Sequence, residues 1–354
     1  MLDILKDCTY HNENYTPNSD TFPSFCNAYN ASRSVRQDGR LETVTENTNK
    51  LALIGVPLEE GSGRGGCAMG PAALRIAGIA DTMTELGFDV ADLGDLRPVP
   101  ADRLTSSEKA RRLPEVAAMA RALEQATYDA ATNGAIPIIL GGDHSLSMGS
   151  VSGMARRANN IGRPLFVLWL DAHADFNSPE TSPSGNIHGM PVAFFCGKAE
   201  FAPILPADRP LVDPRRVFQV GIRSVDPIER QLIAKHGVNV YDMRAIDEKG
   251  MAAIVREIIA AVRAEHGLLH ISLDVDFLDP DVAPGVGTTV PGGATFREAH
   301  LIMEMMHDSG LVSSLDLVEL NPFLDDRGKS ARVMVELAAS LFGRRILDRP
   351  TRAA

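Results

Sequence analysis

The sequence has few cysteines and no long apolar run. Its four cysteines, Cys8, Cys26, Cys67 and Cys196, are scattered through 354 residues without a CxxC spacing. Such cysteines are typical of reduced thiols in a cytosolic protein, and not of disulfides or a thiolate metal site. No stretch approaches the roughly 20 apolar residues that span a bilayer. The first residues also lack the basic and apolar regions of a signal peptide. We therefore expect a cytoplasmic protein with no membrane partner.

The sequence also has fewer basic than acidic residues. The chain has 35 Lys and Arg against 46 Asp and Glu, which gives a formal net charge of -11. An acidic surface repels the phosphate backbone of nucleic acids, so we expect no nucleic-acid partner. The same balance favours a small cationic substrate, although only weakly.

Residues 1–47 lack the apolar periodicity of the rest of the chain. They are rich in Asn, Ser and Thr. This composition predicts a polar N-terminal extension that is either disordered or an arm laid against a neighbouring surface. The aromatic residues Phe22, Phe25 and Tyr29 keep the docked arm open as an alternative.

From Leu51 onward, short apolar runs alternate with segments of helical spacing. Continuous hydrophobicity of this kind predicts strands buried on both faces, as in a parallel sheet covered by helices. Both an open doubly wound sheet and a barrel fit this pattern, and in both the chemistry lies at the carboxyl ends of the strands. The eight runs are 51–56, 88–93, 135–140, 165–170, 216–221, 238–243, 268–273 and 314–320.

Four of these predicted strands end in polar sequence. A charged residue at the end of a buried strand is unfavourable unless it is paired, solvated or bound to a metal. Because residues at i, i+2 and i+4 of an extended segment point to one side, side chains of this spacing can converge on one point. The residues concerned are His144, then Asp171, His173 and Asp175, then Asp274 and Asp276, and finally Glu319.

Without Glu319, this set offers two imidazoles and four carboxylates. Four negative charges balance two divalent cations, so the set favours a binuclear site. Oxygen-rich ligation without cysteine favours a hard or borderline metal such as Mn²⁺. Each motif alone also fits a helix cap or a tight turn. Three such motifs at three strand ends together predict a metal site.

The motifs that carry this chemistry resemble the arginase branch of the ureohydrolase family. They are GGDHS (141–145), DAHADFN (171–177), SPSGNIHGMP (182–191) and SLDVDFLDP (272–280), and the similarity extends to residues 54–75 and 318–322. The resemblance runs from Leu51 to the C-terminus. It implies a three-layer α/β/α arginase-like fold with an eight-stranded, mostly parallel sheet, formed by a single domain over residues 48–354. It selects that fold over the barrel.

The resemblance also implies two Mn²⁺ ions per subunit and a ligand set. His144 and Asp175 would hold one ion, and His173 and Asp276 the other. Asp171 and Asp274 would bridge the two ions. A hydroxide that bridges such a pair is available near neutral pH, and Asp175 would orient it by a hydrogen bond.

Two further residues have predicted catalytic roles. The Glu319 carboxylate offers two acceptors that match a planar guanidinium, and its alternative role is a local ion pair. His188 lies in a loop rich in Gly and Pro, where a lone histidine is usually a surface residue. Its place in the family's loop implies that it gives the leaving amine a proton near pH 7.

The resemblance further implies contacts to the amino-acid end of a substrate. Asn177 and Ser182 would bind the α-carboxylate, with Ser184 and Asn186 close by. Asp226 would pair with the α-ammonium, and Thr288 would lie near the guanidinium. Ser224 departs from the acidic residue of some members. Ordinary turn chemistry is the alternative for each small polar residue.

We therefore expect an arginase activity, in which L-arginine and water give L-ornithine and urea. An agmatinase or another guanidino-acid ureohydrolase is the nearest alternative. A deacetylase of related fold needs only one Zn²⁺, and His144 and Asp276 as extra ligands argue against it. A non-catalytic binder that kept the fold would usually have lost a ligand, and all six are present. The resemblance also implies a homotrimer or homohexamer.

Overall fold

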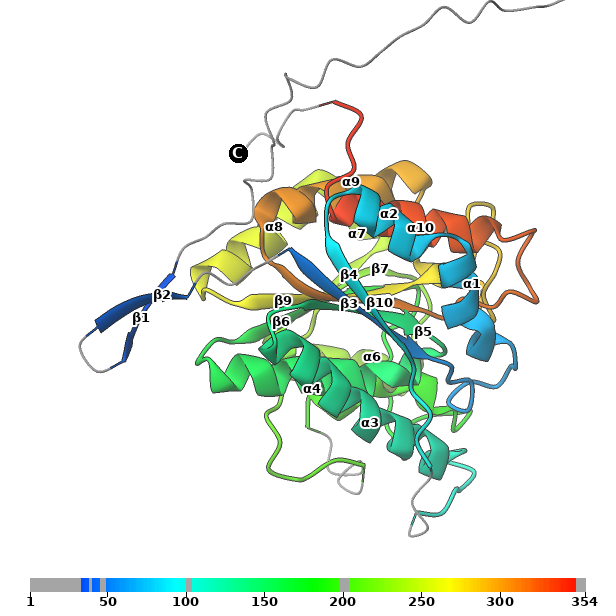
Figure 1. Cartoon of the computed structure of the whole chain (residues 1–354). Helices are drawn as coiled ribbons and strands as arrows, with labels where there is room; N and C mark the ends of the chain where they lie inside the picture. The colour runs from blue at the N-terminus through cyan, green and yellow to red at the C-terminus, as the bar shows by residue number, and fades with distance from the viewer. Residues whose placement is uncertain (1–32, 38–39, 45–48, 100–103, 198–203, 348–354) are drawn as a thin grey trace, which may run out of the picture.

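Eight parallel strands form the central sheet of the computed structural model (Figure 1), which describes residues 33–37, 40–44, 49–99, 104–197 and 204–347. The strands are β3 (Lys50–Val56), β4 (Asp89–Asp95), β5 (Ile136–Gly141), β6 (Leu165–Leu170), β7 (Val217–Ile222), β8 (Asn239–Asp242), β9 (Leu268–Asp274) and β10 (Val312–Val318). Their order is β4-β3-β5-β10-β9-β6-β7-β8, and every neighbouring pair is parallel. The eight predicted strands are confirmed, with bounds that differ by a few residues. The sheet is open, which excludes the barrel.

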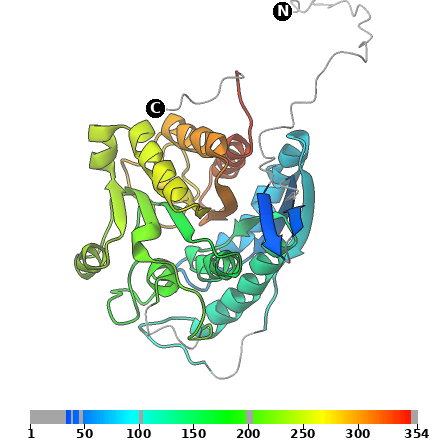
Figure 2. The same cartoon turned by 90° about the vertical axis from the view of Figure 1, so that its left-hand side faces the viewer.

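Helices cover both faces of the sheet (Figures 1 and 2). One face packs against α1 (Gly70–Ile76), α2 (Ile79–Glu85), α7 (Met243–Lys249), α8 (Met251–Ala264), α9 (Phe296–Ser309) and α10 (Lys329–Leu341). The other packs against α3 (Leu113–Thr132), α4 (Ser147–Asn160), α5 (Pro191–Phe195) and α6 (Pro227–His236). Successive residues of a strand face opposite layers, so Leu51 and Leu53 lie in one buried cluster and Ala52 in the other. The predicted three-layer α/β/α fold is confirmed.

A two-stranded antiparallel hairpin lies within residues 1–47. It consists of β1 (Arg33–Gln37) and β2 (Arg40–Val44). The sequence pattern did not predict these strands, because neither shows a clear alternation of apolar and polar residues. The dipeptide Asp38-Gly39 between them is typical of hairpin connections, and this sequence signal could have indicated the hairpin. The aromatic residues of the predicted arm lie outside the described residues.

The four strands with polar ends are adjacent in the sheet, in the order β5-β10-β9-β6. Because the strands are parallel, their carboxyl ends meet at one edge, and the residues that follow them lie close together. Three 3-10 helices at this edge carry predicted site residues: η2 (His144–Leu146), η3 (Ile187–Gly189) and η6 (Val275–Phe277).

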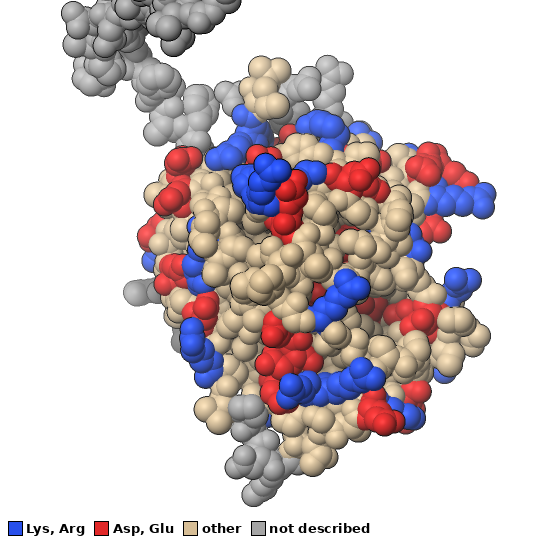
Figure 3. All heavy atoms as spheres, turned by 90° about the vertical axis from the view of Figure 1, so that its right-hand side faces the viewer, with Lys and Arg blue, Asp and Glu red and all other residues tan. Residues whose placement is uncertain are grey.

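The charge on one face, the length of the helices and the cysteines bear on the partners expected from the sequence. On the face shown in Figure 3, basic side chains are interspersed with acidic and uncharged ones, unlike the continuous basic surface that binds a phosphate backbone. None of the described helices has the length and apolarity needed to cross a membrane. Among the described residues, Cys67 and Cys196 form no disulfide. Cys8 and Cys26 lie outside this part of the chain.

We expect Leu168→Ala to destabilise the protein by about 2–5 kcal/mol, because it leaves a cavity in an interior strand. Leu168 is fully buried on β6. Leu93 lies on the edge strand β4 and is 59% exposed, so Leu93→Ala is the matched control and should change stability by less than about 0.5 kcal/mol. Chemical denaturation followed by circular dichroism measures both. Equal losses of stability would contradict the burial pattern.

Candidate metal centre and active site

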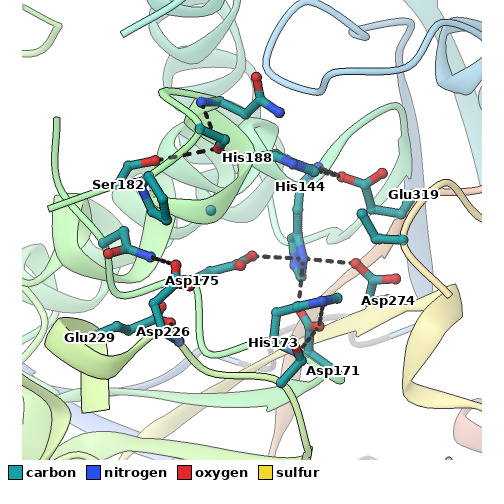
Figure 4. Close-up of a pocket in the computed structure, with 17 residues that line it drawn as sticks. His144, Asp171, His173, Asp175, Ser182, His188, Asp226, Glu229, Asp274 and Glu319 are labelled. Carbon is teal, nitrogen blue, oxygen red and sulfur yellow. Dashed lines mark hydrogen bonds and ion pairs between the residues drawn. The ribbon is translucent and has the colours of Figure 1, made fainter. Parts of the chain in front are cut away.

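The imidazole of His144 faces three carboxylates. Its Nδ1 atom lies 3.0 Å from Asp171 Oδ2, 3.1 Å from Asp274 Oδ2 and 3.4 Å from Asp175 Oδ2 (Figure 4). A ring nitrogen carries at most one hydrogen, so it cannot satisfy three acceptors. The buried atoms His144 Nδ1 and Asp171 Oδ2 in fact make no well-formed hydrogen bond. A cation bound between these atoms would satisfy all of them, and this group could hold a metal ion.

The opposite side of the His144 ring is firmly held. Its Nε2 atom lies 2.8 Å from Ser272 Oγ on β9, and the ring stacks on Trp169 of β6 with centroids 3.9 Å apart. A proton on Nε2 would leave Nδ1 unprotonated, which is the form that binds a metal. Trp169 and Ser272 are contacts that the sequence did not reveal.

A second group shares Asp171 with the first. His173 Nδ1 lies 3.0 Å from Asp276 Oδ2 and 3.5 Å from Asp171 Oδ1. These three residues could also hold a metal ion. The two groups therefore contain five of the six predicted ligands, and the sixth, Asp175, lies 3.4 Å from His144 Nδ1.

The acidic residues converge by tight turns, which differs from the predicted extended alternation. Asp171 follows the end of β6, and its Oδ1 accepts a hydrogen bond from the His173 amide at 2.6 Å. In the same way, Asp274 ends β9 and accepts from the Asp276 amide at 2.7 Å. Asp175 has a φ of 49°, in the left-handed region. Short turns closed by an aspartate are favourable because the side chain satisfies a backbone donor two residues on.

Burial and mutual repulsion shift the pKa values of this cluster. Burial raises the pKa of Asp274 well above its ordinary value, and the charges of Asp276 and Asp171 raise it further. Burial would also raise the pKa of Asp171, but the adjacent imidazoles outweigh it and hold this pKa far below its usual range. Burial opposes protonation of His173, yet Asp171 and Asp276 raise its pKa to about 12. Bound cations would replace the proton as the balancing charge.

Glu319 follows β10 and links the two groups of candidate metal ligands to His188 through hydrogen bonds. Its φ of 62° is unusual for a residue with a side chain, and such strain is often found at functional sites. Its Oε1 atom accepts hydrogen bonds from the His144 amide at 2.8 Å and from His188 Nδ1 at 2.9 Å. Burial would raise the pKa of Glu319, but the charge of His188 lowers it below its ordinary value.

His188 lies in η3, beside the metal groups. Its amide donates to the Gly61 carbonyl at 3.1 Å, which ties it to the loop that follows β3. Burial would lower the pKa of His188, but the adjacent Glu319 carboxylate raises it above its ordinary value. The Glu319 carboxylate thus stabilises the protonated form of His188.

A cavity of about 270 Å³ joins these groups (Figure 4). All six residues predicted to bind substrate beside Glu319 line it: Asn177, Ser182, Ser184, Asn186, Asp226 and Thr288. Asn177 Nδ2 donates to Asp226 Oδ2 at 3.0 Å, and Thr288 Oγ1 donates to Asp276 Oδ2 at 3.0 Å. Ser224 also lines the cavity. The structure thus brings the predicted residues together, and their roles remain predictions.

Glu229 and Asp143 also belong to the site, although the sequence pattern did not single out either. Glu229 lines the cavity and forms a capping box with Asp226 at the start of α6, a pattern readable from the sequence as D-P-I-E. The buried Asp143 carboxylate accepts from the Gly61 and Ser62 amides at 2.7 and 3.1 Å. It thereby fixes the loop after β3, and no local sequence signal marks this long-range contact.

Fold and site together define an α/β protein in which carboxylates and imidazoles that could hold metal ions lie at the carboxyl ends of parallel strands. A sequence model of the Arginase family matches residues 49–343. The arginase of Brucella melitensis is 57% identical over 300 residues, covering 84% of this chain and 98% of that protein. The arginase of Agrobacterium fabrum is 50% identical over 325 residues, covering 92% of this chain and 98% of that protein. The chain belongs to the arginase family.

A solved structure agrees with this assignment. The native structure of the arginase from Bacillus caldovelox superposes with a TM-score of 0.79 at 40% identity, covering 85% of this chain and all of that chain. The family is metal-dependent, which fits the two groups of ligating side chains described above.

We expect Asp274→Asn to weaken Mn²⁺ binding by at least about tenfold, because it removes a charged oxygen that faces His144. Asp247 is exposed, so Asp247→Asn is the control for loss of one negative charge. Calorimetric titration of metal-stripped protein with Mn²⁺ measures the affinity. Equal affinity of the two variants would show that Asp274 is not a ligand.

The pH dependence of the unfolding free energy of the metal-free protein should depend on Glu229. Burial, opposed by hydrogen bonds from the Phe176 and Asp226 amides, raises its pKa from 4.5 to about 7. A carboxyl whose pKa is raised by folding stabilises the fold most below pH 4.5, and this stabilisation is lost as the pH rises through 7. The shift corresponds to roughly 3 kcal/mol.

Glu229→Gln should therefore reduce the fall in unfolding free energy between about pH 4.5 and 7 relative to the parent protein. Urea denaturation of both proteins in EDTA across this range is the measurement. Parallel curves would mean that Glu229 does not titrate there. Absolute stability is not the readout, because the amide also changes the hydrogen bonds.

Proposed function

We propose that this protein is an arginase, which hydrolyses L-arginine to L-ornithine and urea with two Mn²⁺ ions per subunit. The observation that carries the proposal is the cavity itself. One part of its wall holds five of the six predicted metal ligands, all but Asp276, another holds Glu319, and a third holds the residues predicted for an α-amino acid. Membership of the arginase family supports the same function.

The metal ligands would be those predicted from the sequence: His144 and Asp175 for one ion, His173 and Asp276 for the other, and Asp171 and Asp274 for both. When bound, two such ions would acidify a water molecule and so supply a nucleophile near neutral pH. Guanidinium is a poor electrophile because its positive charge is delocalised. The chain's own contribution is to hold the substrate in line with this nucleophile.

Glu319 has one oxygen left for a guanidinium. Its Oε1 atom already accepts from the His144 amide and from His188, whereas Oε2 accepts a long, weak hydrogen bond from the Cys67 thiol at 3.6 Å. The carboxylate would pair with the substrate's cationic group through Oε2. Because the His144 amide donates to Glu319, this pairing would hold the guanidinium beside the residues that would bind the metals.

His188 would supply the proton that the leaving amine needs. Its Nδ1 atom is bonded to Glu319, which leaves Nε2 for proton transfer. Burial would lower the pKa of His188, but Glu319 raises it above its ordinary value, which favours the protonated ring that would give its proton to the departing amine.

The loop of Ser182, Ser184 and Asn186 and the Asn177–Asp226 pair favour arginine over agmatine. Asn177 and Ser182 would bind the α-carboxylate, and Asp226 the α-ammonium. Agmatine has no carboxylate, so it would leave these polar groups without partners and bind more weakly. Thr288 donates to Asp276 and would lie beside the guanidinium.

The remaining proposals concern the location, the oligomeric state and the partners of the enzyme. We propose a cytoplasmic homotrimer or homohexamer with L-arginine as its small-molecule partner and with no nucleic-acid or membrane partner. The acidic net charge of -11 supports the absence of a nucleic-acid partner, the scattered cysteines support the cytoplasm, and the oligomer rests on the family resemblance.

The test is urea release. Metal-stripped protein reloaded with Mn²⁺ should release urea from L-arginine, with a kcat/KM at least about 100-fold above that for agmatine. Treatment with EDTA should abolish the release, and Mn²⁺ should restore it. A preference for agmatine would overturn the substrate, and no urea from any guanidine would overturn the activity.

Glu319→Gln serves as the matched loss-of-function variant, with kcat/KM for L-arginine lowered by about 100-fold or more. The control is Glu248→Gln, because the Glu248 side chain is 62% exposed on a surface helix.

A further inference from the structure

A short turn just before α3 lies against the loop that carries Ser182, Ser184 and Asn186. The turn comprises residues 107–111, which none of the motifs discussed above includes. The Arg111 amide donates a hydrogen bond to the Gly185 carbonyl at 3.0 Å. This contact joins two segments more than 70 residues apart in the sequence.

Gly185 is enclosed at this contact. Its φ of 71° lies in the left-handed region, and its amide donates to Ser182 Oγ at 3.0 Å. A Cβ atom at position 185 would lie 1.9 Å from the Glu108 carbonyl oxygen and 3.2 Å from Lys109 Cα. Both neighbours are backbone atoms, so no side-chain rotation relieves the overlap. Any residue larger than glycine must push the two segments apart.

The turn itself is rigidly built. The Ser107 and Ala110 backbones exchange hydrogen bonds at 3.1 and 3.3 Å, and Ser107 Oγ also accepts from the Ala110 amide at 3.1 Å. Ala110 is buried against the helices of its layer, and α3 begins at Leu113. The turn is therefore anchored in the core, and the loop that holds Ser184 and Asn186 is the part that would move.

A movement of Gly185 would shift some residues of this loop and leave others in place. Ser184 and Asn186 flank Gly185 directly, and the Asn186 amide donates to Ser184 Oγ at 3.2 Å. His188 is held separately, because its amide donates to Gly61 and its ring is bonded to Glu319. A shift at Gly185 would thus displace the residues for the amino-acid end while leaving the proton donor in position.

We propose that the turn 107–111 determines how tightly the enzyme holds the amino-acid end of its substrate, acting through its contact with Gly185. This inference rests on the proposed function, since it assigns the loop to an α-amino acid. Gly185 and Ser107 are positioning residues. They set the place of Ser182, Ser184 and Asn186 and take no part in the bond-breaking step.

The test compares Gly185→Ala with Gly162→Ala in the Mn²⁺-loaded enzyme. Gly162 has a φ of 65°, close to that of Gly185, but a Cβ atom at position 162 would meet nothing within 4 Å, so it controls for the backbone strain alone. Gly185→Ala should raise KM for L-arginine about tenfold with kcat changed by less than about twofold. Gly162→Ala should leave both constants unchanged.

Binding of L-ornithine, measured by calorimetry, gives a readout that does not need turnover. Its Kd should rise in Gly185→Ala by the same factor as KM, because ornithine shares the amino-acid end. Inhibition by the guanidinium ion should stay unchanged, because this ion occupies only the Glu319 end. Ser107→Ala, at an exposed residue, is a milder variant that should raise KM and Kd a few-fold.

The outcomes separate the two proposals. If the parent enzyme releases no urea but binds ornithine, the proposed activity is wrong and the binding series still tests the turn. If it binds no ornithine, both proposals fall. An unchanged KM and Kd in Gly185→Ala, an equal rise in Gly162→Ala, or a fall in kcat alone would overturn the role of the turn.

Discussion

Four buried carboxylates lie around two imidazoles where four central strands end, and their mutual repulsion is the constraint on which the site depends. Taken out of water, such charges oppose folding unless cations balance them. The pKa of Asp274 is raised by burial and like charge, whereas that of Asp171 is lowered by the two imidazoles. The structure therefore holds the cluster together against its own electrostatics. The main source of that restraint is the sheet, whose apolar strands fix the positions of the residues that follow them.

Hydrogen bonds from polar residues around the cluster also hold several loops in place. Asp143 fixes the loop after β3, whose Gly61 carbonyl holds His188. Glu319 joins His188 to the backbone of His144. The metal groups and the substrate loops are thus parts of one hydrogen-bonded network, so substitutions at Asp143, Glu319 and His188 should not act additively.

The apolar runs were enough to predict the eight strands, because parallel strands buried on both faces leave a strong signal in the sequence. The choice of the three-layer fold over a barrel came from the family resemblance. Charges at strand ends also marked the residues that the structure gathers in two groups that could hold a metal ion, and they marked Glu319. The predicted substrate residues came from the family resemblance, and the roles of all these residues stay predictions. The backbone that gathers the charged residues was not predictable, because the left-handed φ of Asp175 and Glu319 has no local sequence signal. Trp169 and Ser272 were missed for a different reason: their contacts with His144 join separate strands, and only the three-dimensional fold brings them together.

The strand order also bears on how the chain acquires its structure. β10 is the last of the described strands in the sequence, yet it lies between β5 and β9 in the middle of the sheet. His144 follows β5, and Asp274 ends β9, so the gap between these two residues closes correctly only after β10 has been inserted. A chain that still lacks β10 would therefore not bring His144 and Asp274 together, whereas Asp171, His173 and Asp276 follow the adjacent strands β6 and β9. The first metal group thus depends on the whole sheet, and the second depends on one strand pair.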